Sequence, residues 1–167
     1  MHLIEFNQAS ETEVKTFLKH CVQIESWSNT LSSQRPYESL DALLATAKLQ
    51  AQSWDWQEIK TALDKHPRIG EKKAQSALSD KEQSFSNREQ SAISSNEEMQ
   101  QAILQGNIAY EKKYGYIFLI KASGLSSEDI LQALTYRLLN DPENEKRIVH
   151  HQLAEIALLR LQQELKA

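Results

Sequence analysis

Near its C-terminus the chain reads Leu153-Ala154-Glu155-Ile156-Ala157-Leu158-Leu159-Arg160-Leu161, a run that is apolar nearly all round. A helix with this pattern is buried on most of its surface. Arg160 is the exception, and its guanidinium must be paired, reach outward or hold an anion, because an unpaired buried charge is costly. Two roles for Arg160 therefore stay open: an ion pair with a neighbouring acid such as Glu155 or Glu164, and the binding of an anionic ligand.

The rest of the chain is also mostly helical in its pattern. Capping residues followed by apolar residues at helical spacing mark helix starts. Residues 27–36 lack this pattern and are predicted to be a polar connection. Residues 70–85 also lack it and are predicted to be a long loop, with or without a short helical turn. The short apolar run from Tyr116 to Ile120 is predicted to be extended. The expected fold is an all-α, single-domain helical bundle with one short extended segment. The predicted helices start at or next to Ser10, Ser39, Asp55, Ser86, Asn96, Ser127 and Pro142.

Length and composition narrow the class of protein. A chain of 167 residues, 40% hydrophobic and 25% charged, suits one globular domain over residues 1–167. The net charge of -4 argues against a nucleic-acid partner. Cys21 is the only cysteine, which favours a reducing compartment. No stretch of the sequence is apolar enough to span a bilayer. We expect a cytoplasmic protein with neither a nucleic-acid nor a membrane partner.

One histidine stands at a predicted corner of the chain, in the segment His66-Pro67-Arg68-Ile69-Gly70. A proline disfavours helix at the residue before it, so His66 is expected at a helix C-terminus or just beyond it. An imidazole there can transfer protons near neutrality. It can equally complement the negative end of the helix dipole. This segment alone leaves both interpretations open.

Two segments share the pattern Ser-x-x-Glu-Gln, from Ser79 to Gln83 and from Ser86 to Gln90. Each is also a capping box, in which serine and glutamate satisfy the free amides of a helix start. Capping is therefore the structural explanation for either segment, and ligand binding the functional one. The second is the better candidate for a site because apolar Ala92 and Ile93 follow it.

Four motifs occur in one order along the chain: His66-Pro67-x-Ile69-Gly70, Ser86-x-x-Glu89-Gln90, Asn107-x-x-Tyr110-x-x-Lys113-Tyr114-Gly115-x-x-Phe118-Leu119-Ile120 and Arg160-Leu161. Taken together, they resemble the 2-oxo-4-hydroxy-4-carboxy-5-ureidoimidazoline (OHCU) decarboxylases, and the similarity runs over nearly the whole chain. The resemblance implies an all-α, generally dimeric enzyme that converts OHCU to (S)-allantoin in urate breakdown, without a cofactor or metal.

The same resemblance implies roles for individual residues. His66 and Glu89 would be catalytic, with His66 as the acid or base. The other implied site residues would bind the ureido, hydroxyl and carboxylate groups of the substrate, some of them through main-chain groups. Glu82, in the first Ser-x-x-Glu-Gln segment, remains the alternative to Glu89. The implied substrate-binding residues are Pro67, Ser86, Gln90, Phe118, Leu119, Ile120, Lys121, Ala122 and Arg160.

Two other functions stay open at this point. The chain can be a non-catalytic helical module for protein interaction, in which His66 matches a helix dipole, Ser86 and Glu89 form a cap and Arg160 pairs with an acid. It can also be a decarboxylase of the same fold that acts on another heterocyclic carboxylate. A site that converges on these residues would favour an enzyme.

Overall fold

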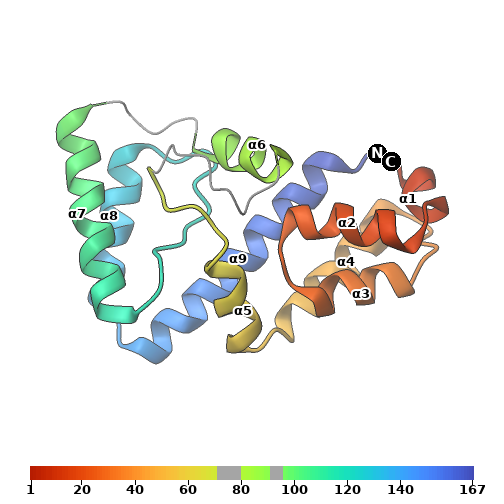
Figure 1. Cartoon of the computed structure of the whole chain (residues 1–167), viewed down its shortest axis with the longest axis horizontal. Coiled ribbons are helices and arrows are strands. Elements are labelled where there is room, and N and C mark those ends of the chain that lie inside the picture. The colour runs from red at the N-terminus through yellow and green to blue at the C-terminus, as the bar shows by residue number, and fades with distance from the viewer. Residues whose placement is uncertain (71–79, 91–95) are drawn as a thin grey trace. The chain divides into compact units, whose positions relative to one another are not determined.

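The computed structural model describes residues 1–70, 80–90 and 96–167, whose ribbon is drawn in colour in Figure 1. This described part forms nine α-helices, and its one β-type pairing is an isolated bridge between His2 and Lys166. The predicted all-α fold is confirmed. Of the predicted extended segment Tyr116–Ile120, residues 117–120 belong to a stretch, 117–122, that forms neither helix nor strand, and Tyr116 lies in a bend. The helices are α1 (Leu3–Gln8), α2 (Glu11–Cys21), α3 (Glu25–Ser33), α4 (Leu40–Gln52), α5 (Trp56–Leu63), α6 (Asp80–Glu89), α7 (Glu97–Tyr114), α8 (Ser127–Arg137) and α9 (Pro142–Glu164).

Several helices begin at the capping residues that the sequence predicts. Before α2, the Glu13 amide donates to Ser10 Oγ at 3.2 Å, and the Ser10 amide donates to the Glu13 carboxylate at 2.9 Å. Asp55 and Glu58 make the same reciprocal pair before α5, at 2.8 and 3.2 Å. These bonds satisfy amides that a helix start leaves without backbone partners.

The prediction of a polar connection at 27–36 is wrong, because α3 occupies most of it. Trp27 and Leu31 are one helical turn apart and fully buried. Ser28 and Ser32 lie beside them and are buried too, and the Ser28 hydroxyl donates to the Ile24 carbonyl oxygen at 3.4 Å. A serine whose hydroxyl donates to a carbonyl oxygen of its own helix can lie on a buried face. The serine-rich sequence of α3 therefore resembles a polar loop although it forms a helix.

The predicted loop at 70–85 is wrong for residues 80–85, which are helical, and the predicted helix start at Ser86 is wrong as well. Helix α6 begins at Asp80, so Ser86 lies inside it and not at its N-terminal cap. The helix is polar, yet it buries Phe85 completely and leaves Glu89 only 8% exposed. Ser79 and the rest of residues 71–79 lie outside the described residues.

The structure divides into two compact units, residues 1–62 with 154–167, and residues 63–153. In the first unit, α3 packs against both α2 and α4. The Trp27 indole nitrogen donates to the Ala47 carbonyl oxygen at 3.0 Å, which ties α3 to α4 inside the core. The Leu3 amide donates to the Lys166 carbonyl oxygen at 2.9 Å, so both ends of the chain meet in this unit (Figure 1).

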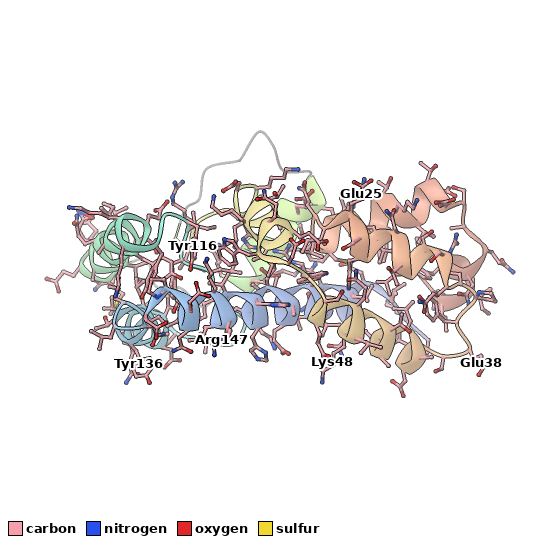
Figure 2. The ribbon with its side chains drawn as sticks, turned by 90° about the horizontal axis from the view of Figure 1, so that it is seen from below. Glu25, Glu38, Lys48, Tyr116, Tyr136 and Arg147 are labelled. Carbon is pink, nitrogen blue, oxygen red and sulfur yellow. The ribbon has the colours of Figure 1, made fainter. Side chains whose placement is uncertain are left out.

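In the second unit, α7 and α8 lie side by side (Figure 1). A Cβ atom at Gly106 would collide with the Leu134 side chain, so a larger residue there would force Leu134 to shift. Figure 2 labels two tyrosines of this unit: the Tyr136 ring projects outward from α8 and is 68% exposed, whereas Tyr116 is buried. In the described part of the chain, no helix combines the length and the apolar character needed to cross a membrane.

Candidate functional site

The turn that carries His66 follows directly after α5 in the chain. The His66 amide donates to the Leu63 carbonyl oxygen at 3.0 Å, which closes the last turn of the chain before Pro67. His66 is half-buried and Pro67 is buried. The turn ends at Gly70, whose φ of 82° lies in the left-handed region that favours glycine. The predicted position of His66, just beyond a helix C-terminus, is confirmed.

Side chains from two other segments hold this turn by its main chain. The Gly70 amide donates to Gln90 Oε1 at 2.9 Å, and Asn107 Nδ2 donates to the Ile69 carbonyl oxygen at 3.0 Å. At the surface, the Arg68 guanidinium makes a two-pronged ion pair with Glu111, at 2.9 and 3.1 Å. The turn is therefore fixed from the C-terminal end of α6 and from α7 before any ligand arrives.

The hydrogen bond between Gly70 and Gln90 also relates the His66 turn to the second Ser-x-x-Glu-Gln segment. Gln90 follows α6 directly, and Glu89 is the last residue of that helix. Glu89 is 8% exposed, whereas Glu82 on the same helix is half-buried. The structure thus brings the His66 turn and the end of α6 together. Ser86 lies one turn before Gln90, and its side chain is outside the described residues.

The segment 118–122 is held by side chains rather than by a neighbouring strand. Arg137 Nη1 donates to the Leu119 carbonyl oxygen at 2.6 Å, and the Lys121 amide donates to Gln152 Oε1 at 2.8 Å. Within the described part of the chain, the amides of Ile120 and Ala122 donate to no acceptor, although both residues are buried. Buried amides without acceptors are rare in folded proteins, which makes these two main-chain groups candidates for ligand binding.

A buried ionic cluster stands behind this segment. The Glu145 carboxylate is fully buried and accepts from the Tyr110 hydroxyl at 2.6 Å and from Arg137 Nε at 2.7 Å. Burial, and next the hydrogen bond to Glu145, raise the pKa of Tyr110 well above its ordinary value. Tyr110 therefore stays a neutral donor at physiological pH.

Arg160 belongs to the other unit, on the last part of α9. It is 4% exposed, and its Nη1 donates to the Cys21 carbonyl oxygen at 3.2 Å. The burial expected from the apolar run is confirmed.

Sequence patterns did not single out four residues that support these elements. Asn107 and Tyr110 belong to the motifs that carry the family resemblance, but no role follows for them from spacing alone. Arg137 and Glu145 sit in helix ends where charged residues are common, so composition gave no signal. A useful signal is an isolated charge at an apolar position of a helix, which Arg137 shares with Arg160: Arg137 follows Ile130 and Leu134 by helical spacing and is 5% exposed.

Comparison with solved structures first defines the class of fold. The chain superposes with a TM-score of 0.73 on a crystal structure of OHCU decarboxylase in the presence of (S)-allantoin, at 23% identity over 93% of this chain and 97% of that one. A crystal structure of (S)-allantoin synthase gives the same TM-score at 16% identity, over 99% of this chain and 54% of that one. The chain therefore shares the fold of the first structure and of the superposed part of the second.

Comparison with sequences then gives the family. The family model described as OHCU decarboxylase matches residues 7–162, so the chain belongs to the OHCU decarboxylase family. The chain is 29% identical to the uric acid degradation bifunctional protein TTL of Arabidopsis thaliana, over 86% of this chain and 44% of the relative. It is 26% identical to the bifunctional protein PucL of Bacillus subtilis (strain 168), over 94% of this chain and 31% of the relative. The chain thus spans less than half the length of these relatives.

Proposed function

We propose that this protein decarboxylates OHCU to (S)-allantoin in the breakdown of urate. The observation that carries the proposal is the family match, which runs through both compact units and includes the His66 turn, the end of α6, the segment 118–122 and Arg160. Relatives named as uric acid degradation proteins support the same pathway. The preformed turn at His66 and the two free amides at Ile120 and Ala122 support a catalytic rather than a purely structural use of these elements.

The proposed reaction can proceed without a cofactor, because the substrate itself can accept the electron pair that decarboxylation leaves. When the bond between the ring and its carboxyl group breaks, carbon dioxide leaves and the electron pair stays on the substrate. The imidazoline ring, with its conjugated nitrogens and carbonyl, can delocalise that pair. A proton must then be added to one face of the ring. The protein's tasks are to orient the carboxylate for cleavage, to stabilise the developing anion and to deliver the proton to that face.

The site residues divide these tasks among them. His66 transfers the proton, because its imidazole is half-buried on a turn that is fixed in place. Glu89 accepts hydrogen bonds from hydroxyl or ureido groups of the substrate. Ser86 and Gln90 also bind the substrate, next to Glu89. The main chain at Pro67 and at residues 118–122 provides further polar contacts, and Arg160 binds an anionic group of the substrate.

The test is to add the protein to freshly generated OHCU and to follow (S)-allantoin by circular dichroism against the slow spontaneous reaction. A rate and a chiral excess above that background support the proposal. Allantoin without chiral excess refutes it and favours a non-catalytic interaction module. Turnover of a different heterocyclic carboxylate, with none of OHCU, would favour the same fold acting on another substrate.

We also propose that the reaction needs no metal or organic cofactor. Protein that has been unfolded, dialysed against EDTA and refolded should then recover its full specific activity without additions. Recovery that depends on an added metal ion, or on a fraction removed by dialysis, would contradict this proposal.

The organisation of the chain leads to a proposal on its oligomeric state. We propose that residues 1–167 form a single domain and that two copies of the chain form a homodimer. The family match across both units supports the single domain. Two apolar side chains on α7, Leu104 and Ile108, are exposed, and a dimer interface would bury them. One cooperative unfolding transition and a dimer in sedimentation velocity are expected, whereas two transitions or a monomer would contradict the proposal.

For location we propose the cytoplasm. Cys21 is buried, and it is the only cysteine in the chain, so no disulfide can form within the chain. A protein without disulfides is suited to a reducing compartment. Fractionation of the source cells should recover the protein with cytoplasmic markers, and recovery with a secreted or organellar fraction would overturn the assignment.

A further inference from the structure

A buried ion pair joins the end of α8 to the first turns of α9. Arg137 Nη2 lies 2.6 Å from Glu145 Oε1, and Asn140 Nδ2 donates to the other carboxylate oxygen at 3.0 Å. Arg137 is 5% exposed and Glu145 is fully buried. Such a pair contributes little net stability, because removing two charges from water costs about as much as their attraction returns. Its presence therefore calls for a use other than stability.

Within the described residues, the other contacts of the Arg137 side chain are with Leu119, Phe118 and Tyr110. Its Nη1 donates to the Leu119 carbonyl oxygen at 2.6 Å. Its guanidinium lies 4.5 Å from the centre of the Phe118 ring and 5.8 Å from that of Tyr110. Glu145 fixes one edge of the planar guanidinium, which leaves the other edge aimed at Leu119. The pair thus sets the position of the main chain at this point.

This anchor is next to the free amides. The Ile120 amide comes from the peptide unit whose carbonyl oxygen, at Leu119, receives the Arg137 hydrogen bond. A peptide unit is planar, so a hydrogen bond that fixes the carbonyl also fixes the amide of the same unit. A donor to that carbonyl also polarises the unit, which makes the amide a stronger donor. Arg137 therefore both orients the Ile120 amide and strengthens it.

We propose that Arg137 and Glu145 are positioning residues for substrate binding, acting through the peptide unit between Leu119 and Ile120. Arg137 holds this unit so that the Ile120 amide points at a carboxylate or carbonyl oxygen of the substrate, and Glu145 holds Arg137. Neither side chain touches the substrate. The inference rests on the proposed function, since it assigns a cause to the binding geometry of residues 118–122.

The test uses the double variant Arg137→Met with Glu145→Leu, which removes both charges together and leaves no buried charge unpaired. A matched control, Lys146→Met with Glu143→Leu, removes a surface ion pair from the same helix α9. If the amides bind substrate and transition state alike, KM for OHCU should rise about tenfold or more with a smaller change in kcat. The control should keep both constants within about twofold.

A second readout is independent of activity and of how well the double variant folds. The variant Arg137→Lys keeps the positive charge but lacks the planar guanidinium that bonds to Glu145 and Leu119 at once. In this variant, amide hydrogen exchange at residues 118–122, measured by NMR, should accelerate about tenfold relative to α7. Unchanged exchange in this segment overturns the positioning role, whether or not the wild type turns over OHCU. An active wild type with unchanged KM in the double variant overturns it as well. An inactive wild type with accelerated exchange in Arg137→Lys contradicts the proposed function and upholds the anchor.

Discussion

The Asn107 side chain donates a hydrogen bond from Nδ2 to the carbonyl oxygen of Ile69, at 3.0 Å, across 38 residues of sequence. Asn107 is 4% exposed, so this bond is made away from water, where losing it is most costly. It fixes the turn three residues after His66. Within the described part of the chain, Asn107 Oδ1 is buried without a hydrogen-bond partner, so the amide is held by its donor side alone.

Replacement of Asn107 should therefore affect both stability and turnover. In Asn107→Asp the carboxylate cannot donate to Ile69, and it repels the carbonyl oxygen instead. We expect a loss of about 1–3 kcal/mol in the free energy of unfolding, measured by urea denaturation. The kcat should fall about tenfold or more because His66 is no longer held in place. The exposed residue Asn144 provides the control, since Asn144→Asp should change neither quantity; equal effects of both variants would contradict the role of Asn107.

The two Ser-x-x-Glu-Gln segments can be separated by a matched pair of variants. Glu89 is 8% exposed and adjoins Gln90, which contacts the His66 turn, whereas Glu82 lies two turns earlier on α6. Glu89→Gln should lower kcat/KM about a hundredfold or more, and Glu82→Gln should stay within about twofold. Steady-state kinetics on OHCU measures both. The reverse ranking would assign the site to Glu82.

Arg160 is predicted to act in binding. Arg160→Lys keeps the charge and loses the planar fork that matches a carboxylate, so KM should rise about tenfold with kcat less affected. Arg147, labelled in Figure 2, is exposed on the same helix and provides the control Arg147→Lys, with KM unchanged. An unchanged KM in Arg160→Lys would leave Arg160 the structural role of holding Cys21.

Alkaline pH should destabilise the fold through Tyr116. Burial raises the pKa of Tyr116 to about 12, from an ordinary value of about 10. Between these values the unfolded chain has lost the proton that the folded chain keeps, so the free energy of unfolding falls as pH rises from about 10 to about 12. Tyr116→Phe should make this fall shallower in urea titrations, whereas exposed Tyr136→Phe should not. Parallel pH curves for wild type and Tyr116→Phe would contradict the assignment.

The sequence was sufficient for features that depend on near neighbours. The capping pairs Ser10 with Glu13 and Asp55 with Glu58 are three residues apart, so their side chains meet as soon as the helix forms. The position of His66 followed from Pro67 in the same way. The burial of Arg160 followed from its apolar neighbours along one helix.

Features made by distant residues were not predictable in this way. Arg137 reaches Leu119 across 18 residues, and Asn107 reaches Ile69 across 38, so no local period contains either bond. Helix α3 was concealed by buried serines, and α6 by a polar sequence that packs through Phe85 and Glu89. In each case the sequence composition is typical of a loop, and packing of a few side chains in the core stabilises a helix instead.

The central claim is that the protein sets the chirality of the product through His66. The most direct measurement compares wild type with His66→Asn on freshly generated OHCU by circular dichroism, after both proteins are shown to have the same helical spectrum. We predict an excess of (S)-allantoin with wild type and only the spontaneous, racemic background with His66→Asn. Chiral product at the wild-type rate from His66→Asn, or no chiral excess from the wild type, would contradict the account.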